Sequence, residues 1–110
     1  MTEEKNIYHP FILSAYKESY SLLLTNLKWD FFEEKNYLGN GHDWTRIIKK
    51  MTIESDVELM KTLEFDSEAD MFCVVSNKLE SLVKIVDIVV EFFDDDEKLR
   101  EVIDKYASYE

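Results

Sequence analysis

Two adjacent residues in the middle of the chain, His42 and Asp43, are the best candidates for acid–base chemistry. Histidine exchanges a proton near neutral pH, and a carboxylate that orients its ring can make it a general base. Side chains that meet on a helix are three or four residues apart, so direct neighbours rarely face each other. A helix cap at Asp43, without a catalytic pair, is therefore the favoured interpretation. A small enzyme that uses His42 and nearby carboxylates is the weaker alternative.

The other reactive side chains are too few to build a catalytic or metal site. Zinc sites need several Cys or His ligands at close spacing, and this chain has two histidines and one cysteine. Cys73 lies between Phe72 and Val74, which is typical of a buried, inert thiol. The Gly-Asn-Gly sequence at 39–41 is too short for a phosphate-binding loop, and no lysine follows it. We expect no catalytic residue, no metal ligand and no cofactor.

Two clusters of acidic residues remain. The first alternates like a calcium loop but lacks the central glycine and the final glutamate of the twelve-residue pattern. A solvated turn and a helix cap are the ordinary interpretations of the two clusters. The functional alternative is that they form a patch that binds a basic partner protein. The residues of this candidate patch are Asp66, Glu68 and Asp70 in the first cluster, and Asp94, Asp95, Asp96 and Glu97 in the second.

Composition favours a folded, cytoplasmic protein. The 110 residues suit one domain over 1–110, with residues 1–6 as a frayed tail, and a hydrophobic content of 45% excludes a disordered chain. There is no apolar run long enough for a transmembrane helix, the N-terminus does not resemble a signal peptide, and a single cysteine fits a reducing compartment.

The charge is strongly acidic and unevenly distributed. The formal net charge is -11, with 10 acidic and 8 basic residues over 1–62 but 14 and 5 over 63–110. Such a charge opposes binding to nucleic acid or to an anionic membrane, because phosphates would be repelled. It favours a basic protein partner, which we expect to approach the C-terminal half.

Both glycines of the chain lie in one short segment, at Gly39 and Gly41. Glycine and asparagine tolerate positive φ, so the segment predicts a tight corner with consecutive positive φ values. Asp43 is the expected N-cap of the helix that follows. Trp44 begins the apolar face of that helix.

The pattern of apolar residues predicts two hairpins and several helices. Alternation over 11–16 and 19–25 predicts one hairpin with a turn at Lys17 and Glu18, and the segments 63–65 and 71–75 predict a second. Helices are expected over 27–36 with Asn26 as cap, over 43–53, and over 78–93 with Asn77 and Glu80 as a capping box. A short helical turn is expected over 56–61, and a last helix begins after the three aspartates at 94–96.

Together these elements predict an α+β fold: a small antiparallel sheet made of two hairpins, with helices packed mainly on one face. The segment 78–93 is apolar over much of its circumference, which indicates a central helix covered on two sides or used at an interface. A monomer and a weak homodimer are both compatible with this pattern.

Two segments resemble the immunity protein 51 family. The segment 39–44 is similar to a GNGYDW-like signature, and the segment 63–73 is similar to an apolar-x-Phe-Asp-x-Glu-Ala turn that leads into a Met-Phe strand. The order and separation of the two also match, and the resemblance extends from Pro10 to Phe93. The residues that carry it, which we expect to be mainly structural, are Tyr37, Gly39, Asn40, Gly41, Asp43, Trp44, Phe65 and Phe72.

Three positions depart from the family pattern. His42 stands where a tyrosine is usual, Ser67 where a proline is common, and Lys35-Asn36 replaces a glycine-containing turn. These differences concern the local conformation of loops.

The resemblance implies a bacterial protein that is encoded beside a secreted toxin of a polymorphic toxin or contact-dependent inhibition system. Such a protein binds a cognate toxin domain in the cytoplasm and blocks it without catalysis. Many of these toxins are nucleases with basic clefts, so the expected partner is basic. The alternative is an acidic nucleic-acid mimic or adaptor unconnected with toxins, which explains the charge but not the paired motifs.

Overall fold

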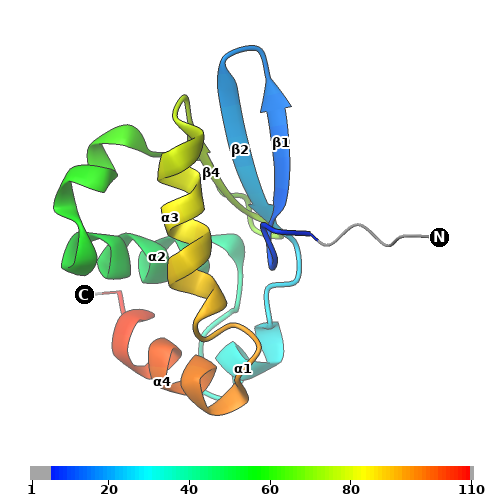
Figure 1. Cartoon of the computed structure of the whole chain (residues 1–110). Helices are drawn as coiled ribbons and strands as arrows, with labels where there is room; N and C mark the ends of the chain where they lie inside the picture. Colours follow the sequence, from blue (N-terminus) through cyan, green and yellow to red (C-terminus); the bar gives the residue numbers. More distant parts are fainter. Residues whose placement is uncertain (1–5, 110) are drawn as a thin grey trace.

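One layer of the molecule is a four-stranded antiparallel sheet (Figure 1). Its strands are β1 (Ile12–Tyr16), β2 (Ser19–Leu24), β3 (Glu64–Phe65) and β4 (Phe72–Ser76). The computed structural model describes residues 6–109, and in it β1 pairs with β2 and β3 with β4. Both predicted hairpins are therefore present. They are joined by pairing of β2 with β4, so that the strand order is β1-β2-β4-β3.

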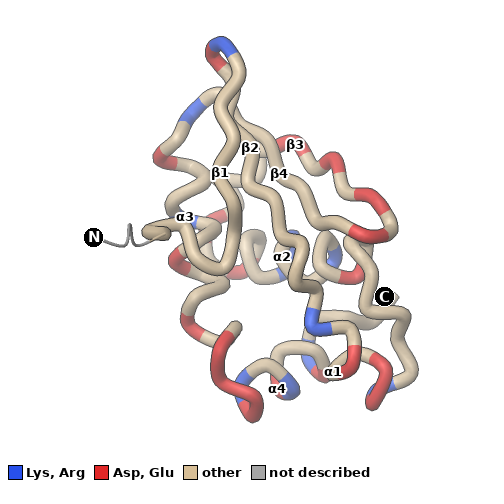
Figure 2. The backbone as a smooth tube through the Cα atoms, turned by 90° about the vertical axis from the view of Figure 1, so that its right-hand side faces the viewer, with Lys and Arg blue, Asp and Glu red and all other residues tan. Residues whose placement is uncertain are grey.

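Helices form the second layer. They are α1 (Trp29–Glu33), α2 (Gly41–Ser55), the 3₁₀ helix η1 (Val57–Thr62), α3 (Leu79–Val90) and α4 (Asp96–Tyr106). Both α2 and α3 contact β4, and Figure 2 shows the sheet in front with these two helices behind it. The predicted α+β fold, with helices mainly on one face of a small antiparallel sheet, is confirmed.

The core lies between the two layers. Strand alternation directs Leu22 and Leu24 of β2, and Phe72 and Val74 of β4, toward the helices, and all four are fully buried. Every major helix contributes to the same cluster: Trp44, Ile47 and Ile48 from α2, Leu82, Ile85, Val86 and Val89 from α3, and Leu99 and Ile103 from α4.

Helix α1 is shorter than the predicted helix over 27–36, and Asn26 does not cap it. Lys28 occupies the N-cap position with φ 53° and forms no side-chain cap. A left-handed residue cannot continue a right-handed helix, so Leu27 is buried in the connecting segment instead. Asn36, with φ 67°, lies beyond the other end of α1.

The Gly-Asn-Gly corner also differs from the prediction. Only Gly39 has positive φ, at 74°, whereas Asn40 has φ -93° and Gly41 is the first residue of α2. Asn40 is the N-cap, and Asp43 is the third helical residue of a reciprocal capping box. The predicted N-cap at Asp43 is therefore wrong by one helical turn, because the sequence contains two residues that can cap.

Helix α3 ends at Val90, three residues before the predicted end. Phe92 and Phe93 lie in a turn, and both are buried, so their apolar character reflects the core and not a helix. The predicted capping box of Asn77 and Glu80 is absent, because Lys78 is the N-cap residue and has no side-chain cap bond. The break at 94–96 is confirmed: Asp95 accepts from the Lys98 N–H and caps α4.

The expected frayed tail falls on residues 1–6, of which only Asn6 belongs to the described part. Its side-chain amide donates to the carbonyl of Phe11 at 2.8 Å. None of the helices in residues 6–109 is long and apolar enough to span a membrane.

Candidate functional site

The carboxylate of Asp43 organises the corner before α2. It is 1% exposed and accepts from the N–H groups of Gly39 at 2.7 Å and of Asn40 at 3.3 Å. Arg46, one helical turn later, forms a salt bridge with it. Backbone donors and a guanidinium together satisfy a buried negative charge, so Asp43 has a structural role here.

Arg46 and Lys50 connect α2 to the C-terminal segment. The Arg46 Nε donates to the carbonyl of Ala107 at 3.1 Å, and its guanidinium lies 3.9 Å from the ring centre of Tyr109. Lys50 donates to the carbonyl of Ser108 at 2.6 Å. Tyr37 completes the contact, with its ring centre 6.3 Å from that of Tyr109.

Trp44 anchors the same corner in the core. It is fully buried, its Nε1 donates to the Leu27 carbonyl at 2.7 Å, and its ring contacts Phe32, Phe92 and Phe93. Phe72 is likewise fully buried, and Phe65 packs on it with ring centres 6.1 Å apart. Trp44 and Phe72 therefore belong to the core, and Phe65 packs against it.

The second motif segment is fastened directly to the first. The Gly41 N–H donates to the Ala69 carbonyl at 3.1 Å. Ser67 Oγ lies 2.7 Å from Thr45 Oγ and accepts from the Cys73 N–H at 3.0 Å. The loop between β3 and β4 is thus held against the N-terminus of α2, and its three acidic side chains, Asp66, Glu68 and Asp70, are exposed.

The second acidic cluster lies at the α3–α4 junction. Asp94 contacts His9, with Oδ2 2.7 Å from Nε2, and Asp95 is occupied as the α4 cap. Asp96 and Glu97 are exposed in the first helical turn. Figure 2 shows this junction low on one side, beside α4, and the β3–β4 loop higher up on the other side, so the clusters form two separate acidic surfaces.

The two residues considered for catalysis lie in different environments. His42 is exposed on the first turn of α2. Cys73 is 6% exposed, and burial together with the charges of Asp66 and Glu68 raises the pKa of its thiol above the ordinary value. A raised pKa leaves less of the reactive thiolate at neutral pH. Within residues 6–109, no group of His, Cys, Asp or Glu side chains is arranged to hold a metal ion.

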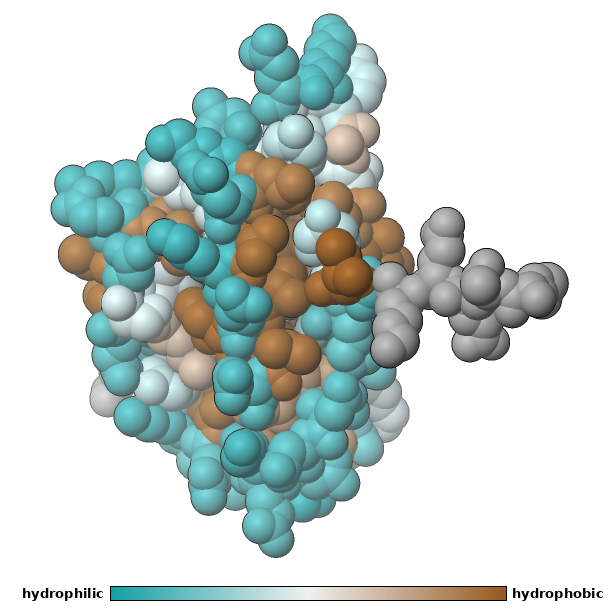
Figure 3. All heavy atoms as spheres, viewed as in Figure 1, coloured by the Kyte–Doolittle hydropathy of each residue, from teal (hydrophilic) through white to brown (hydrophobic). Residues whose placement is uncertain are grey.

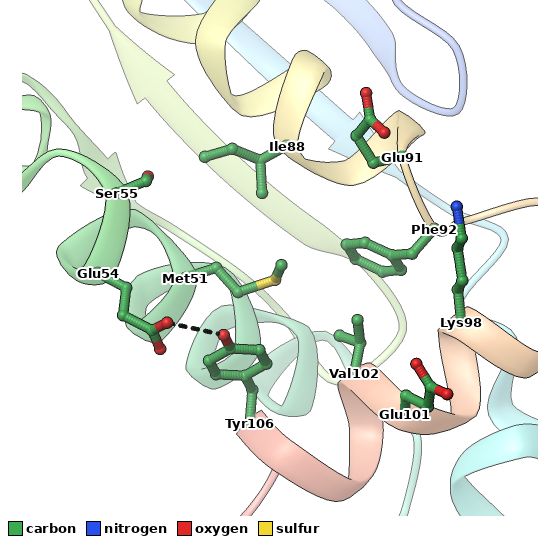
Figure 4. A pocket seen from close by; sticks show the side chains of 10 residues that line it. All are labelled: Met51, Glu54, Ser55, Ile88, Glu91, Phe92, Lys98, Glu101, Val102 and Tyr106. Carbon is green, nitrogen blue, oxygen red and sulfur yellow. Dashed lines mark hydrogen bonds between the residues drawn. The ribbon is translucent and has the colours of Figure 1, made fainter.

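A groove of about 520 Å³ lies between α2, α3 and α4 (Figure 4). Its floor is apolar, and its edge carries three glutamates and one lysine. Figure 3 shows apolar residues gathered along α3 on this face, surrounded by hydrophilic ones. The lining residues are Met51, Glu54, Ser55, Ile88, Glu91, Phe92, Lys98, Glu101, Val102 and Tyr106.

Polar contacts on both sides of α4 fix this helix against its neighbours beside the groove. Tyr106 donates its hydroxyl to Glu54 at 3.1 Å, and Lys105 lies 3.8 Å from the same carboxylate. A hydrogen bond with Tyr106, reinforced by Glu54, raises the pKa of Lys105. On the other side of α4, Arg100 donates two hydrogen bonds to Glu34, which lowers the pKa of that carboxyl group.

Sequence reasoning did not identify the groove. Its three helices are distant in the sequence, and no local motif links Met51, Ile88 and Val102. The wide apolar surface predicted for the 78–93 segment was a signal, because Ile88, which lines the groove, is only half-buried.

Comparison with protein families gives a match to immunity protein 51 over residues 11–108. Comparisons with curated proteins and with solved structures give no match. The match covers nearly the whole chain and includes both motif segments, the groove and both acidic surfaces. The chain therefore belongs to the immunity protein 51 family.

Proposed function

We propose that this protein binds a cognate bacterial toxin domain in the cytoplasm and neutralises it by covering its surface, without catalysis. The observation that carries the proposal is the family match over residues 11–108, since the family name denotes immunity to a toxin. The target that best suits the chain is a nuclease toxin whose nucleic-acid cleft is basic.

The net charge of -11 supports a basic target. Opposite charges accelerate the encounter of two proteins, and like charges keep the acidic protein away from nucleic acids and anionic membranes. Both acidic surfaces, at the β3–β4 loop and at the α3–α4 junction, contribute to this field. An inhibitor that must reach its target before the cell is damaged benefits from such steering.

The environments of the candidate reactive side chains support a non-catalytic mode of action. Asp43 is used by Arg46 and by two backbone amides, and the pKa of the Cys73 thiol is raised. The motif segments, 39–44 and 63–73, maintain the fold on which the binding surface is displayed.

Co-expression tests the proposal. The toxin domain encoded next to this gene is expressed in a bacterial host with this protein, with an unrelated acidic protein, or alone. We expect growth to be restored only by this protein, and the purified pair to elute as a stoichiometric complex. If cells die equally in all three cases, the proposal is rejected. Equal protection by the unrelated acidic protein would instead favour a nonspecific acidic adaptor.

A second experiment examines catalysis. The His42→Ala variant is tested for rescue beside the wild-type protein. We expect full rescue, because an exposed histidine that performs no chemistry can be lost without consequence. Loss of rescue by a variant that folds normally would favour the enzyme alternative.

A further inference from the structure

We infer that the groove between α2, α3 and α4 is the contact site for the toxin domain, where it receives an apolar side chain flanked by lysine or arginine. This inference rests on the proposed function and assigns it to a particular surface. The groove combines two features that tight protein interfaces share: an apolar centre and a polar margin.

The floor supplies the apolar centre. Met51 of α2, Ile88 of α3 and Val102 of α4 are half-buried, and Phe92 below them is 3% exposed. Figure 4 shows these four side chains directed into the groove, three from helices and Phe92 from the turn after α3. A floor built from several helices is rigid, while the flexible Met51 side chain can adapt to what it contacts. Residues that dominate binding energy usually occupy such central, water-excluding positions.

The margin supplies negative charge. Glu91 and Glu101 are exposed, and within the described residues neither forms a salt bridge. Glu54, by contrast, already accepts from Tyr106 and lies near Lys105. Glu91 and Glu101 are therefore the carboxylates that remain for basic side chains of the partner.

The acidic α3–α4 junction adjoins the groove. Residues 94–97 lie in the chain directly between the groove residues Phe92 and Lys98. The groove thus continues into one of the two acidic surfaces, so that a basic protein attracted to the junction arrives at the apolar floor. The β3–β4 loop lies away from the groove, so we expect it to contribute only to the long-range electrostatic attraction and not to the contact.

Charge and shape favour a basic toxin over other occupants. A second copy of this chain would bring another -11 charge to an acidic margin, and like charges at an interface are unfavourable. Small-molecule sites enclose most of their ligand, whereas this groove is open to solvent.

The first test changes the margin. Glu91→Lys/Glu101→Lys is compared with Glu18→Lys/Glu33→Lys, in which two exposed glutamates outside the groove are reversed and the net charge is the same. Binding to the catalytically inactivated toxin domain encoded next to the gene is measured by calorimetry. We expect the groove variant to bind roughly tenfold more weakly or worse, and the control to stay within about threefold of wild type. Equal affinities of the two variants would overturn the inference.

The second test changes the floor. Met51→Gln preserves the size of the side chain but makes it polar, and we expect it to raise the dissociation rate roughly tenfold. Thermal unfolding establishes that the variant is folded. Hydrogen exchange of the wild-type complex provides a measurement without substitutions: we expect amide protection over 88–92 and 98–106, and protection confined to other segments would reject the groove.

The failure of this inference is distinguishable from failure of the proposed function. If the wild-type protein neutralises the toxin while both groove variants neutralise it equally well, the toxin binds elsewhere and the function stands. If the wild-type protein itself does not bind the toxin, the proposed function fails. Light scattering of the protein without the toxin tests for self-association. If the wild-type protein is a dimer and the groove variants are monomers, the groove is a dimer interface and the inference is overturned.

Discussion

The amide of Gly41 donates a hydrogen bond to the carbonyl of Ala69 at 3.1 Å, and this contact joins the two motif segments of the chain. The two residues are far apart in the sequence but meet where α2 begins beneath the β3–β4 loop. Their closeness explains the glycine at position 41. A Cβ added there would lie 2.1 Å from the Glu68 carbonyl oxygen and 2.2 Å from that of Met71.

Gly41→Ala should therefore destabilise the protein. At an open helical position the same change gains about 1 kcal/mol from helix propensity, so the sign of the effect is informative. Here we expect a loss of about 3 kcal/mol in the free energy of unfolding, because backbone atoms must move to admit the methyl group. Urea denaturation measures the loss. The exposed neighbour His42→Ala is the control, with an expected change within about 0.5 kcal/mol. A neutral or stabilising Gly41→Ala would show that the loop moves aside freely.

The two tryptophans should behave in opposite ways. Trp44 is fully buried and Trp29 is 61% exposed. We expect Trp44→Ala to cost about 3–5 kcal/mol through the cavity it leaves, and Trp29→Ala to cost about 0.5 kcal/mol or less. Trp44→Phe should lose about 1–3 kcal/mol, because the buried Leu27 carbonyl loses its donor.

Denaturation of the three variants checks these values, and fluorescence provides an independent measurement. The emission that remains in Trp29→Ala comes from a buried indole and should lie at shorter wavelength than that of Trp44→Phe. Similar stabilities for Trp44→Ala and Trp29→Ala would contradict the packing described above.

The apolar pattern predicts the fold better than the helix boundaries. The hairpins and the core face of α2 follow from alternation and helical spacing, which depend on residues that are close in the sequence. The N-cap of α2 cannot be predicted from local spacing, because Asn40 and Asp43 are both good capping residues and only the fold selects Asn40. The helix predicted over 78–93 is too long at its end because it includes Phe92 and Phe93. A sequence does not distinguish apolar residues that are buried in a turn from those that are buried in a helix.

The candidate site was less accessible to prediction. Exposed acidic residues can be counted in a sequence, but their arrangement into two separate surfaces depends on tertiary structure. The groove requires Met51, Ile88 and Val102 to converge from three helices. The wide apolar surface predicted for the 78–93 segment, which is compatible with a helix used at an interface, was the signal in the sequence for this groove.

The Cys73 thiol should titrate above its ordinary value of 9.0. Burial raises its pKa, and Asp66 and Glu68 raise it further. We expect the pH of half-maximal alkylation to fall in Asp66→Asn/Glu68→Gln and to stay unchanged in Asp96→Asn/Glu97→Gln, which removes equal charge at the distant junction. Equal midpoints in the two double variants would contradict the electrostatic contribution.

The same raised pKa has a consequence for stability. Because the folded state favours the protonated thiol, its contribution is fully present below the pKa of the unfolded chain and is lost as pH rises through the folded pKa. Between pH 8 and pH 10.5, the wild-type protein should therefore lose more stability than Cys73→Ala, whereas the two should respond alike between about pH 6 and pH 8. Parallel curves over the whole alkaline range would show that the thiol has the same pKa in both states.

The two acidic surfaces should differ in how they affect toxin binding. Asp94→Lys/Asp96→Lys changes the junction beside the groove, and Asp66→Lys/Glu68→Lys changes the β3–β4 loop by the same net charge. Asp95 is left intact because it caps α4.

Association rates with the inactivated toxin domain are measured from low to high salt. Both variants should associate more slowly than wild type at low salt and converge with it above about 0.5 M, where screening shortens the range of charges to a few ångströms. Only the junction variant should also dissociate faster, because its charges border the proposed contact. A faster dissociation confined to the loop variant would place the contact at the loop instead.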